Sequence, residues 1–257
     1  MPKISPKAIV EDSAVLADDV CVGPFCYIGP DVTLESGVIV ETNVTIIGQT
    51  TIGKQTHVFP MAVIGATPEG ADEPGSCLIG QANSIREHVT VYSGMQTPTR
   101  IGRNNLLMIE TTVGPQATIG DHIVVANGSQ IGQDAIIDEY VRMSGFTSIE
   151  PGVHVGAYTF TAGYVGVDRD APPFAMIQGY PFRVRGVNTH NLRACGFGES
   201  DIKALKNAFR ELFNGSGIQA KPEAMERLAG EDEMNPFVER LIESIAESQQ
   251  TGGGSDA

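Results

Sequence analysis

Aromatic and charged residues are scarce in this chain of 257 residues. Tryptophan is absent, aromatic residues make up 6% of the chain and charged residues 19%, whereas glycine occurs 30 times. Many positions therefore hold small residues, which suit places where a backbone turns or stacks. That composition favours stacked β coils over a helical bundle.

Positive charge is also in short supply. The chain has 17 Lys and Arg and 31 Asp and Glu, which gives a net charge of −14. A nucleic-acid partner is therefore disfavoured, because phosphates are bound mainly by Lys and Arg. No run approaches the ~18 apolar residues that cross a bilayer, and the Met1-Pro2-Lys3 start lacks the apolar region of a signal peptide. We expect a cytoplasmic protein without a transmembrane segment.

Paired metal or disulfide motifs are missing as well. The four cysteines include no C-x-x-C pair, so reduced thiols are expected rather than a disulfide framework or a zinc knuckle. They are Cys21, Cys26, Cys77 and Cys195. The histidines lack the short separations of a γ-type carbonic anhydrase, which binds its metal with three imidazoles. The sequence therefore predicts no catalytic metal, and no cofactor is expected.

What the sequence does contain is an aliphatic residue at every sixth position. The frame runs through Val10, Leu16, Val22, Ile28, Leu34, Val40, Ile46, Ile52, Val58 and Ile64, resumes at Ile79, Ile85 and Val91, and continues through Ile101, Leu107, Val113, Ile119, Val125, Ile131, Ile137, Met143, Ile149, Val155 and Thr161. A period of six suits one flat side of a triangular coil with the aliphatic residue pointing inward. Stacked at roughly 4.8 Å, three hexads to a coil, these repeats predict a parallel β-helix about 38 Å long. A β-sandwich would show strict alternation and irregular loops instead.

Two insertions and a change of pattern divide the chain. The frame is interrupted at 66–77 and at 94–99, where loops should leave the prism, either to carry binding groups or as inert excursions. We assign the hexad repeats to residues 1–187, a C-terminal α-helical domain to 188–250 and a disordered tail to 251–257. Helices are predicted from Ser200 to Phe213, from Pro222, and from Pro236 to about Gln249.

The segments that carry a family resemblance extend over nearly the whole chain. They are Ala8-Ile9-Val10-Glu11, Gly23-Pro24-Phe25-Cys26, Ile85-Arg86-Glu87, Asn105-Leu106-Leu107-Met108-Ile109, Ala126-Asn127, Asp170-Ala171-Pro172-Pro173, Gln178-Gly179, Gly186-Val187-Asn188 and Gly196-Phe197. With them the chain resembles the acyl-carrier-protein:UDP-N-acetylglucosamine O-acyltransferases, which begin lipid A synthesis. Hexads alone are widespread, but the Pro-Pro, Gln-Gly and Gly-Val-Asn series is specific. The resemblance implies a left-handed β-helix and a homotrimer.

The chain departs from this family at its catalytic position. Acyl transfer from a carrier thioester to a sugar hydroxyl needs a base and an oxyanion donor, and the family's base is a histidine oriented by an aspartate. Counted forward from Asn105, those positions hold Pro115 and Gln116. Proline has no ionisable group, and a glutamine amide is no base near neutral pH. The frame from Ile101 to Thr161 is unbroken, so slipping the alignment restores no histidine.

Other functional positions have changed too, and some remain. Family histidines correspond to Tyr92, Thr112, Gln133 and Glu150, basic residues correspond to Ala194 and Cys195, and a lysine is missing from the first insertion. The resemblance places an oxyanion donor at Gly132, a limit on acyl-chain length at Gly163 and a nucleotide contact at Asn188, although both glycines could be structural. With Gln133 and His190 these residues form the candidate substrate-binding set.

Three residues are candidate substitute bases: Glu110, Glu150 and His190. A carboxylate can act as a base near neutral pH if burial raises its pKa. His190 stands in the family's nucleotide region, whereas His122 and His154 lie near corners of the coil, where packing or solvated histidines are expected.

Three functions remain open from the sequence. One is a non-catalytic trimer whose inter-subunit cleft still holds an acyl chain, an acyl-carrier protein or a nucleotide sugar. Another is a divergent acyltransferase with a different acceptor and base, and the third is a purely structural trimer. An acidic carrier protein would need a basic docking surface, for which the cluster of candidates is Arg183, Arg185, Arg193, Lys203 and Lys206.

Overall fold

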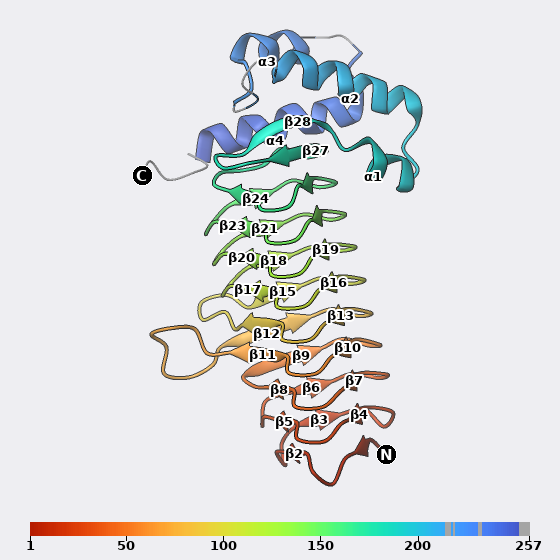
Figure 1. Ribbon diagram of the computed structural model, residues 1–257, viewed down its shortest axis with the longest axis vertical. Helices are drawn as coiled ribbons and strands as arrows, with labels where there is room; N and C mark the ends of the chain where they lie inside the picture. The colour runs from red at the N-terminus through yellow and green to blue at the C-terminus, as the bar shows by residue number, and fades with distance from the viewer. Residues whose placement is uncertain (214–216, 218, 231–232, 252–257) are drawn as a thin grey trace.

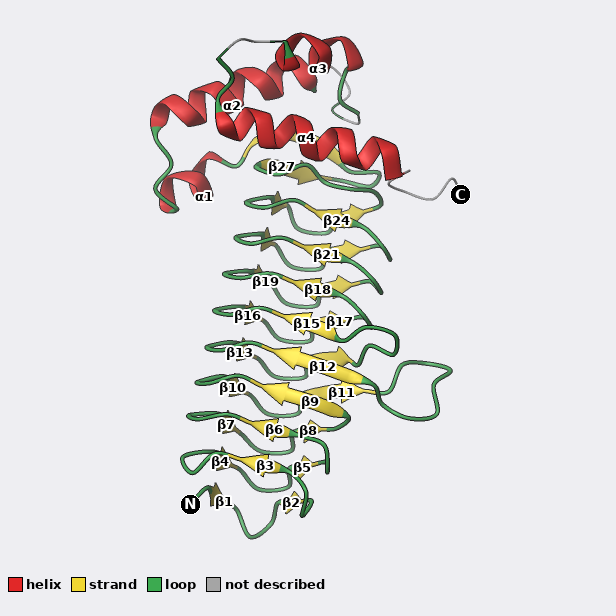
Figure 2. Ribbon diagram, turned by 180° about the vertical axis from the view of Figure 1, so that it is seen from behind, coloured by secondary structure: helices red, strands yellow, loops and turns green. Residues whose placement is uncertain are grey.

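The chain winds into a triangular prism with helices at one end. The computed structural model describes residues 1–213, 217, 219–230 and 233–251 (Figure 1). Three sheets form the sides, and through residue 167 each strand pairs in parallel with strands three elements away, because three strands make one coil. The N-terminus lies at the uncovered end of the prism and the helices cover the other (Figure 2).

The strands of the three sides, named A, B and C in chain order, have the following bounds. Side A contains β1 (Lys3–Ile4), β4 (Cys21–Val22), β7 (Ile39–Val40), β10 (His57–Val58), β13 (Ser84–Ile85), β16 (Leu106–Leu107), β19 (Val124–Val125), β22 (Arg142–Met143), β25 (Phe160–Thr161), β27 (Ala175–Gln178) and β28 (Arg183–Val187). Side B contains β2 (Ile9–Val10), β5 (Tyr27–Ile28), β8 (Thr45–Ile46), β11 (Val63–Ala66), β14 (Thr90–Tyr92), β17 (Thr112–Val113), β20 (Gln130–Ile131), β23 (Ser148–Ile149) and β26 (Gly166–Val167). Side C contains β3 (Val15–Leu16), β6 (Thr33–Leu34), β9 (Gln49–Ile52), β12 (Ser76–Ile79), β15 (Thr99–Ile101), β18 (Thr118–Ile119), β21 (Ile136–Ile137) and β24 (His154–Val155).

The aliphatic frame residues fill the inside of the prism, as the period of six predicts. Tyr27 pairs with Thr45 and Ile28 with Ile46, one coil apart, and Ile28, Ile46 and Ile64 are fully buried. The residue two positions before each frame residue also points inward, because side chains alternate along a strand. The predicted parallel β-helix is therefore confirmed.

Each coil turns three corners, named after the sides that they join. Residues at these turns adopt a positive φ, which only glycine tolerates freely, yet most corners use other residues, such as Gln116 (φ 63°), His122 (φ 57°) and Phe146 (φ 57°). Both insertions leave the prism at the B/C corner, at 67–75 between β11 and β12 and at 93–98 between β14 and β15. The larger one projects from the prism in Figure 1.

Four helices follow the β-helix: α1 (Thr189–Ala194), α2 (Glu199–Leu212), α3 (Pro222–Ala229) and α4 (Pro236–Thr251). The last three match the helices that the sequence predicts, and Thr251, expected in the tail, ends α4; residues 252–257 lie outside the described part. The sequence did not predict α1 or the antiparallel pairing of β27 with β28. None of the described helices is long and apolar enough to cross a membrane.

A ladder of buried asparagines crosses the C/A corner inside the prism. Asn83 Nδ2 donates to Gly80 O and Gly102 O, both at 2.8 Å, and Asn83 Oδ1 accepts from Asn105 N at 2.8 Å. Asn105 Nδ2 donates to Gly120 O at 2.9 Å, and its Oδ1 accepts from Ile123 N at 2.7 Å. These bonds satisfy backbone groups that the corner turns away from the sheets.

Asn105→Ala is expected to lower the free energy of unfolding by about 2–6 kcal/mol, because two buried backbone groups lose their partners at about 1–3 kcal/mol each. Chemical denaturation followed by circular dichroism measures the change. The matched control is Asn127→Ala at an exposed position, which should stay within about 0.5 kcal/mol of the parent. A loss for Asn105→Ala no larger than that of the control would show that the ladder does not stabilise the coil.

Candidate functional site

The two residues that the resemblance predicts at the catalytic positions, Pro115 and Gln116, lie on the B/C corner just after β17. Pro115 is half-buried, and its carbonyl accepts from Asp134 N at 3.0 Å. Gln116 N donates to Thr99 Oγ1 at 2.8 Å, while its side-chain Oε1 accepts from Gln96 N at 3.1 Å. The second insertion therefore contacts the corner directly and restrains the Gln116 side chain.

The other end of the Gln116 amide binds a carboxylate one coil further along. Gln116 Nε2 donates to Asp134 Oδ1 at 2.6 Å, and Gln133 Nε2 donates to Asp134 Oδ2 at 3.0 Å. We call Gln96, Gln116, Gln133 and Asp134 the Gln116 network. Its hydrogen bonds use both oxygens of the carboxylate, so the corner presents amides and a carboxylate that already has two donors.

Asp134 was not among the residues singled out from the sequence. The coil length could have identified Asp134 from the sequence. Gln116 and Asp134 are 18 residues apart, so they occupy the same corner in successive coils. The sequence gives this spacing, but not the direction in which the amide of Gln116 points.

The two insertions pack on each other beneath the network. Gly75 N donates to Ser93 Oγ at 2.8 Å, and Ser76 pairs with Gly94 in a short antiparallel bridge. A Cβ on Gly75 would lie 2.2 Å from Gly94 O, so only glycine permits this contact. The first insertion thereby supports the second, which holds Gln116.

Gly132 is tightly packed in the B/C corner. Its N–H donates to Ile149 O at 2.9 Å within the ladder, so in the single chain the group assigned to an oxyanion already has an acceptor. A Cβ at this position would lie 2.6 Å from Pro151 N. These contacts explain a glycine here on structural grounds, and the oxyanion role stays a prediction.

Asn188 is buried at the start of α1 beside the C/A corner. Its Nδ2 donates to Tyr158 O at 2.8 Å, and its Oδ1 accepts from Asn191 N at 3.4 Å. Asn191 Nδ2 in turn donates to Tyr140 O at 2.8 Å. Asn188 therefore attaches α1 to the prism, and a nucleotide contact would need these bonds to rearrange.

The candidate bases lie on three different corners and are exposed in the single chain. Glu110 lies on the A/B corner, Glu150 on the B/C corner, and His190 on α1 beside the C/A corner. Neither Glu110 nor Glu150 is buried in the single chain. Gly163 lies on the A/B corner, where its Cβ would be 3.5 Å from Gly145 O, an ordinary contact.

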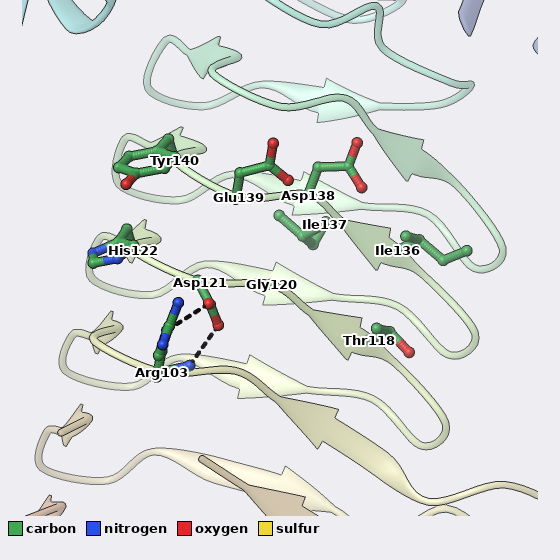
Figure 3. A pocket seen from close by; sticks show the side chains of 10 residues that line it. All are labelled: Arg103, Thr118, Gly120, Asp121, His122, Ile136, Ile137, Asp138, Glu139 and Tyr140. Carbon is green, nitrogen blue, oxygen red and sulfur yellow. Dashed lines mark hydrogen bonds and ion pairs between the residues drawn. The ribbon is translucent and has the colours of Figure 1, made fainter. Parts of the chain in front are cut away.

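A shallow hollow of about 410 Å³ opens on side C next to the C/A corner (Figure 3). His122 stacks on Tyr140 with ring centroids 4.8 Å apart, which agrees with the expected packing role. Asp121 Oδ2 binds Arg103 Nε at 2.8 Å, and Glu139 Oε1 binds Arg240 of α4 at 3.0 Å. Nowhere in the described chain do three or more His, Cys, Asp or Glu side chains converge as a metal ion would need.

Basic residues gather on β28 and α2 at the helical end. Arg185, Lys206 and Arg210 line a hollow of about 410 Å³, whose floor includes Val187 and Phe209. No carboxylate of the described residues forms an ion pair with these three cations, whereas Arg193 pairs with Glu199 at 2.6 Å. Arg193 is therefore neutralised within the chain, and Arg185 and Lys206 are not.

Comparison with known proteins shows which sequences this chain resembles. A family model described as UDP N-acetylglucosamine O-acyltransferase, domain 2, matches residues 170–253. The acyl-[acyl-carrier-protein]–UDP-N-acetylglucosamine O-acyltransferase of Stutzerimonas stutzeri is 35% identical over 255 residues, which cover 96% of this chain and 98% of that protein. The enzyme of the same description from Pseudomonas fluorescens is 37% identical over 219 residues, covering 83% and 85%.

Solved structures agree with these sequence matches. The UDP-N-acetylglucosamine acyltransferase of Bacteroides fragilis superposes with a TM-score of 0.90 at 29% identity, over 95% of this chain and 97% of that one. The enzyme from Francisella novicida gives 0.88 at 28% identity, over 96% and 92%. The chain therefore belongs to the acyl-[acyl-carrier-protein]–UDP-N-acetylglucosamine O-acyltransferase family.

Proposed function

We propose that this protein is a homotrimer that holds an acyl chain, an acyl-carrier protein or a nucleotide sugar in a cleft between protomers, without catalysing the family's acyl transfer. The observation that carries the proposal is the B/C corner itself. Pro115 stands where a base is required, and the neighbouring Gln116 is bonded to both Gln96 and Asp134. A proton acceptor is missing where the acceptor hydroxyl would be activated.

Exposed apolar side chains on the A/B corner support the trimer. Tyr164 is 78% exposed and Phe146 is 55% exposed, and the two rings stack with centroids 5.2 Å apart. Phe25, Met61 and Ile109 extend the same corner with further exposed apolar side chains. A row of this kind is typical of a surface that another protein covers, and copies of one chain assemble most simply about a closed symmetry axis.

Threefold symmetry about the A/B corners would also explain why the candidate residues are scattered. With those corners at the axis, side A of one protomer faces side B of the next, and the outer edges of these sides are the C/A and B/C corners. The Gln116 network of one protomer would then face the Asn188 and His190 region of its neighbour. Residues on separate corners of one chain would thus line one cleft, with Gly163 toward the axis.

The cations at the helical end support a carrier protein as partner. Acyl-carrier proteins are acidic, and opposite charge guides association. The whole chain carries −14, so docking of an acidic partner requires a local basic surface, which Arg185, Lys206 and Arg210 provide.

The test combines a transfer assay with a binding assay on the purified protein. With hydroxyacyl-carrier protein and UDP-N-acetylglucosamine we expect no product above the uncatalysed background, together with saturable binding of the carrier by calorimetry. Arg185→Glu with Lys206→Glu should weaken that binding at least tenfold, about 1.4 kcal/mol, whereas Arg193→Gln, at a cation already paired with Glu199, should change it little.

Turnover by the unmodified protein would overturn the non-catalytic assignment. The triple variant Glu110→Gln, Glu150→Gln, His190→Gln would then show whether those residues include the base. Absence of binding to the carrier protein and to the nucleotide sugar, in a protein that is correctly folded by circular dichroism, would favour a structural role instead.

A further inference from the structure

The outermost residues of the A/B corner, which we call the corner tips, form a column along the prism. His88 N donates to Pro60 O at 3.2 Å, and Glu110 N donates to Glu87 O at 3.0 Å, so each tip rests on the turn of the preceding coil. Met61, His88 and Glu110 have φ values of 64°, 58° and 60°. Because these successive tips share one backbone conformation, their side chains leave the prism in the same direction.

The column is mostly apolar, with one polar interruption. From the second coil to the last, the tips are Phe25, Asn43, Met61, His88, Glu110, Gly128, Phe146 and Tyr164. His88 and Glu110 are adjacent in this series, separated by one coil, so an imidazole and a carboxylate follow each other at the same corner. The 22 residues between them in sequence hide this, because the second insertion lengthens the coil.

Neither of these two side chains is satisfied within one protomer. Both are exposed, and among the residues that the structure describes neither has a hydrogen-bond or ion-pair partner. The neighbouring cation Arg86 is already bound to Glu87, through Nε at 2.9 Å and Nη2 at 3.1 Å. The charge of Glu110 is therefore not neutralised by its own chain.

Threefold symmetry changes the surroundings of both residues, and this step rests on the trimer of the proposed function. With the A/B corners at the axis, three His88 rings form one layer. Three Glu110 carboxylates form the next layer, about 4.8 Å further along the prism. Burying three uncompensated carboxylates at an axis is strongly unfavourable, so the assembly requires a cation there.

Apolar groups enclose the two polar layers on both sides. Met61, one coil before His88, is 48% exposed in the single chain. One coil after Glu110 the ring of Phe146 lies over Gly128, where a Cβ would be 2.7 Å from Phe146 Cε1. In the trimer these groups would close the axis against solvent, and electrostatic attraction is stronger in such an enclosed space than in water.

We propose that three His88 imidazoles and three Glu110 carboxylates, one of each from every protomer, hold one divalent transition-metal ion on the threefold axis. Imidazole nitrogen suits Zn²⁺, Ni²⁺ and Co²⁺, whereas Ca²⁺ and Mg²⁺ prefer a shell of oxygen ligands. The carboxylates offset the charge of the ion, and they can orient the rings by accepting from the second ring N–H. The site is incomplete in one chain, and it lies on a different corner from the Gln116 network.

Titration of the trimer with Co²⁺ tests the site. The full-length protein, purified without an affinity tag and stripped with a chelator, should saturate at one Co²⁺ per three chains, with visible absorption from the bound ion. His88→Asn should abolish this binding, because an amide replaces the imidazole, and asparagine accepts a positive φ. Glu110→Gln should weaken binding by about 10–100-fold.

A second histidine at a corner tip supplies the matched control. His122 lies on the C/A corner with a φ of 57°, so His122→Asn makes the same change away from the axis and should bind Co²⁺ like the parent. Sedimentation equilibrium with and without Co²⁺ separates the two proposals. A trimer that binds no Co²⁺ at this ratio, or whose binding survives His88→Asn, refutes the metal site alone. A monomer under both conditions refutes the trimer and the site together.

Discussion

Acyl transfer is expected to appear when Pro115→His and Gln116→Asp are introduced together. The double variant places an imidazole at the corner and a carboxylate beside it, the pair that the family uses as a base and its orienting group. Removing Gln116 also breaks its bonds to Gln96 and Asp134, which frees the corner. A positioned general base contributes typically about 10²–10⁴-fold, so turnover should rise by that order above the parent.

The backbone at this corner accepts both changes. Gln116 has a φ of 63°, and aspartate tolerates this region better than most residues. Pro115 donates no hydrogen bond, so a histidine there disturbs none, and its carbonyl can still accept from Asp134 N. Folding should therefore be preserved, which circular dichroism and size-exclusion chromatography check before activity is measured.

Three single changes show where any gain arises. Pro115→Ala should remain inactive because it adds no base, and Gln116→Asp alone should do the same. Pro115→His alone should give part of the gain, since its imidazole lacks an orienting partner. If the double variant binds carrier protein and nucleotide sugar yet stays inactive, loss of the base is not the reason for inactivity, and the oxyanion donor becomes the next group to test.

Charging the A/B corner is expected to convert the trimer into monomers. Phe146→Asp with Tyr164→Asp would place adjacent like charges at the axis in each of three protomers, and burying each uncompensated charge there costs several kcal/mol. The mass in solution, by sedimentation equilibrium, should fall from about three times 27.3 kDa to about 27.3 kDa. Binding of a nucleotide sugar should be lost with the trimer, because its cleft requires two protomers.

Outward positions on side C serve as the control. Ile136→Lys changes an equally apolar, 43% exposed side chain on the side that the proposed trimer leaves free, so it should stay trimeric and bind normally. The A/B-centred trimer would be contradicted by an undiminished mass in the corner variant. It would equally be contradicted by a monomeric Ile136→Lys, which would place the interface on side C.

The β-helix could be predicted from the sequence because one physical requirement repeats in every hexad. Each frame residue fills the same interior space, so Val22, Ile46 and Ile119 report the same environment independently. The hairpin of β27 and β28 and the short helix α1 are not part of the repeat. Helix α1 depends on single contacts, such as the bond from Asn191 to Tyr140, which the six-residue period does not predict.

The candidate site was only partly predictable, for a related reason. Counting hexads places Pro115 and Gln116 on one corner, and it also places Glu110, Glu150 and Gly163 in their coils. The bond from Gly132 N–H to Ile149 O is a rung of the regular backbone ladder, so it follows from the repeat. Side-chain orientation is not periodic in this way, so the burial of Asn188 could not be foreseen. The coil length of 18 residues identifies Asp134 as the residue that lies beside Gln116 in the next coil, and therefore as a possible hydrogen-bond partner of Gln116.

The corner that carries Pro115 lies outside the hydrophobic interior. Substitutions at this corner can therefore change the chemistry of the surface without changing the residues on which folding depends. Inward residues determine whether the coil forms, whereas outward residues at a turn touch mainly their own corner and its neighbours. Substitution of a catalytic side chain at such a turn has little effect on folding, so selection for a stable prism does not oppose it. A duplicated gene could thus lose its reaction within a few substitutions while its product kept the shape, the assembly and the ligand surface of the ancestor.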